Sequence, residues 1–231
     1  MGKILRFFLK PKLRYKLFWS YLLSPHPDEV IFKYAFEFID HHGIEGDYLE
    51  FGVWKGRSFA RAYNIWKHLF KAKGRLEDMR FFAFDSFQGL PETSESPEFK
   101  KGQYYSTEKS FKENIAVQGV DLSRTVTVPG WFNDTLNAET KDRISLKKAA
   151  VVFIDCDLYE SAKTVLSFLT GLVQAGTLLI FDDWFAFKGH PDKGEQRAVS
   201  EWLKENQKIK LVEWQNVNWR GKAFIVNIKR Q

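Results

Sequence analysis

The stretch AAVVFIDCDLYES, residues 149–161, decides the fold. Its six apolar residues run without a break into Asp155 and Asp157, and a segment with helical apolar spacing begins at Tyr159. A continuous apolar run of this length is typical of a strand that is buried on both faces, as in parallel sheets. The stretch TLLIFDDW, residues 177–184, repeats the pattern of an apolar run that ends in two acids. The two stretches predict neighbouring parallel strands with carboxylates at their carboxyl ends.

The rest of the chain continues this alternation of short apolar runs and amphipathic segments. We expect strands over residues 47–51, 80–85, 125–128, 149–155 and 177–181, and helices over about 29–42, 58–71, 110–117, 159–173 and 196–205. Two further β-like runs, residues 208–214 and 222–228, predict a terminal antiparallel hairpin at the sheet edge. The pattern predicts an α/β fold, a doubly wound and mostly parallel sheet with helices on both faces.

The net charge of +6 is confined to the start of the chain. Residues 1–16 hold six basic residues and no acid, which leaves 29 basic and 29 acidic residues in the rest. A neutral body disfavours a polynucleotide substrate, because nucleic-acid enzymes carry basic patches on the domain itself. Pro25 and Pro27 mark the boundary between a basic aromatic extension, residues 1–28, and a single domain, residues 29–231. The extension fits a peripheral membrane contact, a lid or a solvated terminus.

Cys156 is the only cysteine, so an intramolecular disulfide and a multi-cysteine zinc site are excluded. The apolar residues of the extension are interrupted by Lys and Arg every few positions, unlike a signal peptide or a spanning helix. We therefore expect a cytoplasmic protein that can associate with a membrane through residues 1–28.

Ligands of open parallel sheets bind beyond the carboxyl ends of the strands, so the residues there carry the most information. Residues 50–56, EFGVWKG, form a strand end followed by a turn with two glycines. Their spacing is GxxxG rather than the GxGxxG of dinucleotide-binding loops. Asp85 ends the next strand, where a carboxylate can accept hydrogen bonds from both ribose hydroxyls of a nucleotide. Together these features indicate an adenosine-type cofactor.

Asp155, Asp157, Asp182 and Asp183 follow the two strands that decide the fold. Carboxylates that converge at neighbouring strand ends repel one another unless a cation lies among them. Oxygen ligands favour Mg²⁺, with Ca²⁺ or Mn²⁺ as alternatives. The competing interpretation is that Asp182 or Asp183 only caps the following turn, since Asp is a common capping residue.

Five motifs in this order resemble the macrocin O-methyltransferase family, metal-dependent class I S-adenosylmethionine (SAM) methyltransferases that act on sugars. They are YLEFGVWKGRS, FAFDSFQGLP, GWFNDTL, FIDCDLYES and FDDW, within residues 47–184. The resemblance implies a Rossmann-like sheet of seven strands and an enzyme that often associates into homo-oligomers. It implies a metal site of Asp155, Asp182 and Asp183, with Asp157 as general base beside Asp155 in the catalytic centre. It also implies that SAM is held by residues in two loops, Glu50, Phe51, Gly52, Gly56 and Ser58 in one, and Asp85 and Ser86 in the other.

The resulting hypothesis is methyl transfer from SAM to a hydroxyl of a sugar or glycosylated metabolite, with a metal that lowers the pKa of that hydroxyl. Trp131 and Phe132 can line the cofactor pocket or pack in the core. Trp184, Tyr159 and His190 are candidate acceptor contacts, although His190 also fits a solvated loop.

Four alternatives compete with this hypothesis. An NAD-dependent oxidoreductase shares the sheet but predicts GxGxxG and no acidic cluster. A nucleic-acid methyltransferase predicts an Asn/Asp-Pro-Pro-aromatic motif where this chain reads IDCDLY. The intact acids disfavour a binding module that has lost its chemistry. A metal-dependent phosphoester hydrolase would use the same carboxylates and stays open.

Overall fold

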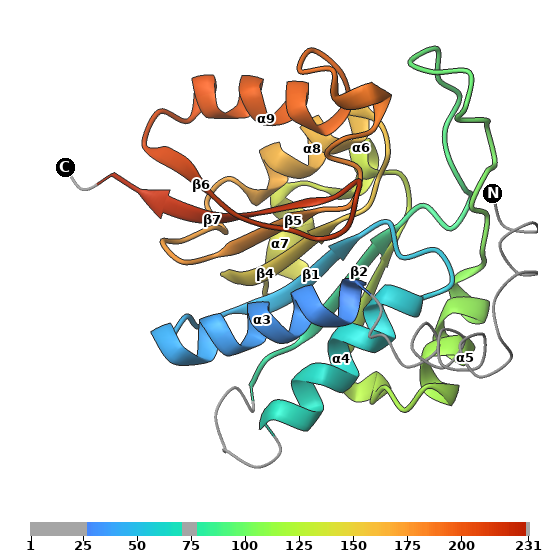
Figure 1. The fold of residues 1–231 in the computed structure, drawn as a ribbon. Coiled ribbons are helices and arrows are strands. Elements are labelled where there is room, and N and C mark those ends of the chain that lie inside the picture. The colour runs from blue at the N-terminus through green and yellow to red at the C-terminus, as the bar shows by residue number, and fades with distance from the viewer. Residues whose placement is uncertain (1–26, 71–77, 230–231) are drawn as a thin grey trace, which may run out of the picture.

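The computed structural model describes residues 27–70 and 78–229, which build one seven-stranded sheet with helices on both faces (Figure 1). The strand order is β3-β2-β1-β4-β5-β7-β6; the strands from β3 to β5 run parallel, and β7 pairs antiparallel with both β5 and β6. The predicted fold class is confirmed. The strands are β1 Asp47–Phe51, β2 Phe81–Asp85, β3 Thr125–Pro129, β4 Ala149–Ile154, β5 Leu178–Phe181, β6 Ile209–Asn216 and β7 Lys222–Ile228.

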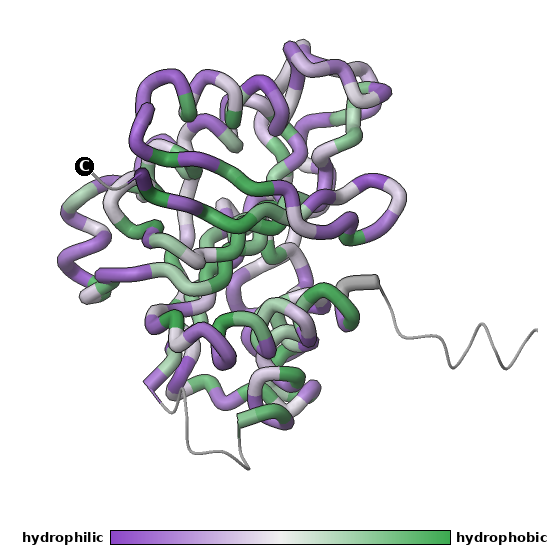
Figure 2. Tube along the Cα trace, turned by 60° about the vertical axis from the view of Figure 1, so that its left-hand side comes forward, coloured by the Kyte–Doolittle hydropathy of each residue, from purple (hydrophilic) through white to green (hydrophobic). Residues whose placement is uncertain are grey.

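The helices form two layers that bury the sheet between them (Figure 1). They are α3 Pro27–His42, α4 Arg57–Phe70, α5 Glu108–Val117, α6 Phe132–Thr135, α7 Ala138–Arg143, α8 Tyr159–Leu169 and α9 Gly194–Glu205, with short 3₁₀ turns η1 Leu122–Arg124 and η2 Phe187–Gly189. The α3, α4 and α5 residues share one core cluster, and the α8 and α9 residues share the other. Figure 2 shows hydrophobic residues concentrated along the central strands between these layers.

The central strands are buried because both of their faces are covered. Every residue of β1, β4 and β5 is buried, and β4 and β5 accordingly have unbroken apolar sequences. Strand β1 also buries Asp47 and Glu50, both of which accept hydrogen bonds. The side chains of β1 alternate between the two layers: Tyr48 belongs to the α4 side of the core, and Leu49 to the α8 side. This alternation fixes which residues at the strand ends can reach a ligand.

Most element boundaries lie within two residues of the sequence expectation, and the larger differences are the end of α8 and two additional helices. Helix α8 ends at Leu169 rather than near residue 173, because Gly171 adopts a positive φ of 84° that ends the helical path. The short helices α6 and α7, between β3 and β4, are not expected from the sequence. Both are too short for a helical apolar period to be recognised.

The expectations for the basic extension concern residues that lie, apart from residues 27 and 28, outside the described part of the chain. Over residues 27–70 and 78–229, no helix combines the length and the apolar character that crossing a bilayer requires.

Gly52 follows β1 at the centre of the sheet and packs against the end of β4. Its φ is 86°, and a Cβ added there would lie 1.8 Å from the carbonyl oxygen of Asp155. The two strand ends are further tied by the hydrogen bond from the Asp155 N–H to the Phe51 carbonyl, 2.9 Å long. Glycine is therefore required at this position both for its backbone conformation and for the space.

Substitution Gly52→Ala should lower the free energy of unfolding by about 3 kcal/mol or more, through left-handed strain plus the forced shift of Asp155. Gly171→Ala is the matched control, because its φ of 84° is similar but nothing lies within 4 Å of an added Cβ. The control should lose about 1 kcal/mol. Denaturant unfolding followed by circular dichroism measures both. Equal losses in the two variants would contradict the importance of the Asp155 contact.

Candidate active site

A cavity of about 480 Å³ lies at the carboxyl ends of the parallel strands. Its wall combines the loops after β1, β2, β3, β4 and β5 with the turn between β6 and β7. The sequence-predicted residues that line it are Gly52, Asp85, Ser86, Trp131, Phe132, Asp155, Asp157 and Asp182. The fold thus brings the predicted cofactor residues and the predicted metal residues to one cavity.

Asp85 holds the loop after β1 through backbone hydrogen bonds. Its Oδ2 accepts the N–H groups of Val53 at 2.8 Å and Trp54 at 3.0 Å, and its Oδ1 accepts the N–H of Phe87 at 2.7 Å. Burial raises the pKa of Asp85, and these three hydrogen bonds oppose the rise. This carboxylate therefore fixes the shape of the cavity wall.

Glu50 faces helix α4 and not the cavity. Its Oε1 accepts the Ser58 hydroxyl at 2.6 Å, and its Oε2 accepts the Tyr48 hydroxyl at 2.5 Å. Phe51 stacks on Phe84 in the core, 4.6 Å between ring centroids. Neither these residues nor Gly56, whose added Cβ would lie 2.4 Å from the Ile115 side chain, belong to the cavity wall. That Glu50, Phe51, Gly56 and Ser58 contact the cofactor stays a prediction, and the contacts above give these residues a structural role in joining β1, α4 and α5.

The ends of β4 and β5 bring three carboxylates together. Strand residues Ile154 and Phe181 are paired, so the residues that follow them lie side by side. One carboxylate oxygen from each of Asp155, Asp182 and Asp183 lies within 4.8 Å of the others. Burial, followed by repulsion from the neighbouring acids, raises the pKa values of Asp155 and Asp183 well above the usual range.

The acidic cluster, Asp155, Asp182 and Asp183, fits a divalent cation. Both carboxylate oxygens of Asp183 are buried and accept no hydrogen bond of normal geometry within the described residues, although Oδ1 lies 3.0 Å from the Arg220 guanidinium. Buried charged oxygens of this kind are costly unless a cation compensates them. Carboxylate oxygens are also the ligands that Mg²⁺ and Ca²⁺ prefer. Asp157 lines the same cavity and is itself buried.

Two residues of this centre escaped the sequence prediction, Asn218 and Arg220. Arg220 places Nη2 at 2.6 Å from Asp182 Oδ2 and Nη1 at 3.0 Å from Asp183 Oδ1. Asn218 donates its amide to Asp182 Oδ1 at 3.2 Å. Both belong to the turn between β6 and β7, which carries no recognisable ligand motif. Only the pairing of β7 with β5 brings that turn to the acids.

A family model described as macrocin O-methyltransferase (TylF) matches residues 31–221, which include every element of this site. The chain belongs to the macrocin O-methyltransferase family. The family resemblance expected from the five motifs is thereby confirmed. The oxidoreductase and hydrolase alternatives lose their support.

Three known proteins resemble this family member. It is 29% identical over 163 residues to the 8-demethyl-8-(2,3-dimethoxy-α-L-rhamnosyl)-tetracenomycin-C 4'-O-methyltransferase of Streptomyces olivaceus, covering 66% of this chain and 58% of that protein. It is 26% identical over 159 residues to the mycinamicin III 3''-O-methyltransferase of Micromonospora griseorubida, covering 62% and 56%. The chain thus matches little more than half the length of these relatives. The crystal structure of CalS11, a calicheamicin methyltransferase, shares the fold with a TM-score of 0.69, 19% identity and 97% coverage of both chains.

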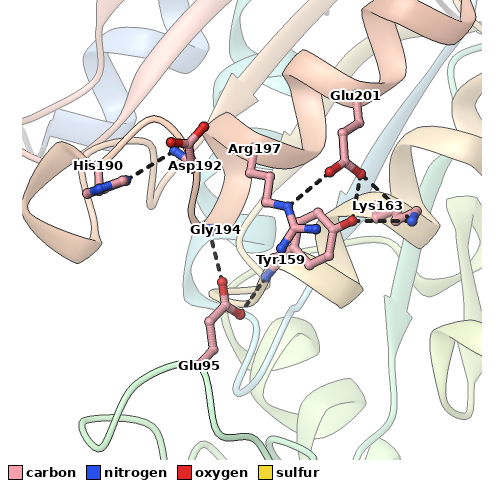
Figure 3. Close-up of polar contacts among 8 residues, drawn as sticks. All are labelled: Glu95, Tyr159, Lys163, His190, Asp192, Gly194, Arg197 and Glu201. Atoms are coloured by element: carbon pink, nitrogen blue, oxygen red, sulfur yellow. Dashed lines mark hydrogen bonds and ion pairs between the residues drawn. The ribbon is translucent and has the colours of Figure 1, made fainter.

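In this family member the loop between β2 and α5, residues 86–107, is anchored by Glu95 (Figure 3). The Glu95 carboxylate accepts the N–H of Tyr159 at 2.8 Å and the N–H of Gly194 at 2.9 Å. These are the first residues of α8 and α9, where free N–H groups favour an anion. The same loop lines the cavity with Gly89 and Tyr104. Glu95 therefore ties one cavity wall to the two helices that follow the acidic cluster.

Two of the candidate acceptor residues, Tyr159 and His190, do not line the cavity, and Figure 3 shows the polar contacts that they make. The Tyr159 hydroxyl donates to Glu201 at 2.6 Å, and the Arg197 guanidinium lies 3.9 Å from the centre of its ring. His190 accepts the N–H of Asp192 through Nδ1 at 3.2 Å, in an exposed loop. The substrate contacts expected of Tyr159 and His190 stay predictions, and in this structure both side chains are engaged in hydrogen bonds away from the cavity wall.

Trp184 is also turned into the core. Its ring packs 5.3 Å from Phe181 and 4.7 Å from Phe224, centroid to centroid. Trp54 and Tyr104 are the aromatic residues that line the cavity near the acids, and they contact each other edge to face at 5.7 Å. The acceptor contact expected of Trp184 stays a prediction, and in this structure its ring packs against β5 and β7.

Substitution Glu95→Ala should release the loop, because two hydrogen bonds to a charged acceptor are lost. We expect tryptic cleavage after the exposed Lys100 and Lys101 to accelerate about tenfold or more, since about 1.4 kcal/mol of loop stability corresponds to that factor. Glu98→Ala, an exposed acid of the same loop, is the control and should be cleaved at the native rate. Mass spectrometry of a proteolysis time course measures both. Native-like protection of Glu95→Ala would show that the loop is held by other contacts.

Proposed function

We propose that this protein transfers a methyl group from SAM to a hydroxyl of a sugar or glycosylated metabolite. The observation that carries the proposal is the shared cavity, in which a wall suited to a nucleoside adjoins a cluster of carboxylates, in a member of the macrocin O-methyltransferase family. Both relatives are O-methyltransferases, and the name of the Streptomyces olivaceus enzyme places a rhamnosyl group on its substrate. A glycoside hydroxyl is therefore the acceptor class that we favour.

The cofactor half of the cavity is built by the loops after β1, β2 and β3. Trp131 and Phe132 supply flat apolar surface for an adenine ring. Asp85 and Ser86 line the same cavity, and Asp85 Oδ1 accepts one backbone hydrogen bond. Its remaining capacity suits a ribose hydroxyl. Gly52 lets the backbone approach the ligand without a side chain in between.

The acceptor half contains the acidic cluster and Asp157. Asp155, Asp182 and Asp183 would hold a divalent cation, which when bound supplies the positive charge that lowers the pKa of a hydroxyl group. Asp157 accepts the hydroxyl proton on a carboxylate oxygen while the hydroxyl oxygen forms a bond to the methyl carbon and the sulfur–methyl bond breaks. The products are the methyl ether, S-adenosylhomocysteine (SAH) and protonated Asp157.

Two features of Asp157 suit this role of general base. Its backbone adopts a left-handed φ of 59°, a conformation that Asp tolerates better than most residues. Burial raises its pKa, which brings the carboxylate closer to the range where a base is effective at neutral pH. The aromatic pair Trp54 and Tyr104 gives the sugar ring a surface to pack on.

Calorimetric titration tests the cofactor and the metal separately. The native chain should bind SAH, and it should bind Mg²⁺. The double substitution Asp182→Ala/Asp183→Ala should retain SAH binding and lose Mg²⁺ binding, because it removes two of the three carboxylates while the nucleoside wall is untouched. Absence of SAH binding by the native chain would end the proposal of methyl transfer.

Substitution Asp157→Asn should lower kcat for methylation of an α-L-rhamnoside by about 10²–10⁴, the usual contribution of a general base. SAH affinity should not change. Glu160→Gln is the matched control, since Glu160 is another acid of the cavity wall but is exposed. Quantifying the SAH that each variant forms gives the comparison. Native kcat in the Asp157→Asn variant would show that another group acts as the general base.

A further inference from the structure

We propose that Arg220 is a built-in counter-cation of the acidic cluster, which competes with the divalent cation for Asp182 and Asp183. The inference rests on the proposed function in one respect, that this cluster binds a divalent cation. Arg220 bridges the two carboxylates with its two terminal nitrogens, at 2.6 Å and 3.0 Å. One guanidinium thus joins two carboxylates that otherwise repel each other.

The turn between β6 and β7 is shaped to deliver this guanidinium. Asn218 Oδ1 accepts the N–H of Arg220 at 2.6 Å and the N–H of Gly221 at 2.8 Å. The Arg220 carbonyl accepts the N–H of Phe185 at 2.7 Å, which ties the turn to the segment just after the acids. A Cβ at Gly221 would lie 2.7 Å from the Phe181 carbonyl oxygen. The backbone at both sides of Arg220 is therefore fixed against the end of β5.

The charges around the cluster require compensation. Asp155, Asp157 and Asp182 line the cavity, and Asp183 and Glu195, the second residue of α9, are buried next to them. Glu195 accepts the N–H of Asp183 at 3.1 Å, so a further carboxylate adds to the negative potential of the site. A guanidinium placed between two of these acids stabilises the cluster before any metal ion binds.

The same position opposes a divalent cation. The atoms that pair with Arg220, Asp182 Oδ2 and Asp183 Oδ1, are carboxylate oxygens that a metal ion would also bind. A guanidinium at hydrogen-bond distance from these oxygens repels a second positive charge there. The Arg220 side chain is 35% exposed and lines the cavity, so it has room to move away. Arg220 therefore stabilises the metal-free protein and lowers its affinity for the cation.

The test compares Arg220→Gln and Arg220→Lys with a matched control, Arg80→Gln. Arg80 pairs with Asp47 at 2.8 Å, and its side chain is 36% exposed, but the pair lies at the amino ends of β1 and β2, opposite the cavity. Each full-length chain is titrated calorimetrically with MnCl₂ and with SAH, and its Tm is measured in EDTA and in 5 mM MnCl₂.

We expect Arg220→Gln to bind Mn²⁺ at least tenfold more tightly than the native chain and to lose about 3 °C or more of Tm in EDTA. Arg220→Lys keeps the charge, so its Mn²⁺ affinity should stay within about threefold of the native value. Arg80→Gln should lower Tm equally in EDTA and in MnCl₂ and leave Mn²⁺ affinity unchanged. SAH affinity should be native in all three variants. If Arg220→Gln unfolds in EDTA, refolding on addition of MnCl₂ supports the inference.

Native or weaker Mn²⁺ binding by Arg220→Gln would overturn the inference, as would failure of an unfolded variant to refold in MnCl₂. In that case Mn²⁺ and SAH binding by the native chain would leave the proposed function intact. If neither the native chain nor Arg220→Gln binds Mn²⁺, the inference and the metal step of the proposed function fall together. SAH binding would still report separately on the cofactor.

Discussion

Repulsion among buried carboxylates is the constraint on which the site depends. Parallel pairing of β4 with β5 forces Asp155 next to Asp182 and Asp183, away from bulk water. Such an arrangement is stable only with positive charge close by, and the chain supplies part of it through Arg220. The antiparallel strand β7 is needed for this, because it carries the turn with Arg220 to the end of β5. The terminal hairpin thus supplies positive charge that partly balances the acidic cluster.

The strands and the position of the acids could be predicted from the sequence because they follow from burial. A strand covered on both faces is largely apolar, so the apolar runs give β4 and β5 nearly to the residue, and β1 departs from this rule only at Asp47 and Glu50. The direction of each side chain at the strand ends was harder. Glu50 has the same parity along β1 as Tyr48, whose side chain faces α4, so its carboxylate turns to that helix. In this part of the chain, the first residue that lines the cavity is Gly52, directly after β1.

Contacts that depend on distant segments could not be predicted. Nothing near Glu95 in the sequence indicates that its carboxylate meets the first N–H groups of α8 and α9, 64 and 99 residues further along. The same holds for Arg220, 38 residues from Asp182. The packing of Trp184 was equally hidden, because its contacts with Phe181 and Phe224 depend on the pairing of β5 with β7. A single sequence shows residue types and spacing, whereas these contacts are set by how layers and turns pack.

The Asp85 carboxylate fixes the loop after β1 through the main-chain N–H groups of Val53 and Trp54, and the loop after β2 through that of Phe87. Main-chain donors are present whatever side chain the residue carries, proline excepted. The hydrogen bonds to Asp85 therefore do not depend on which side chains these positions carry. Trp54, whose side chain lies at the cavity, occupies one of them, with a φ of 43° that disfavours β-branched residues. A different side chain at position 54 can therefore change the surface of the cavity while the loop keeps its path.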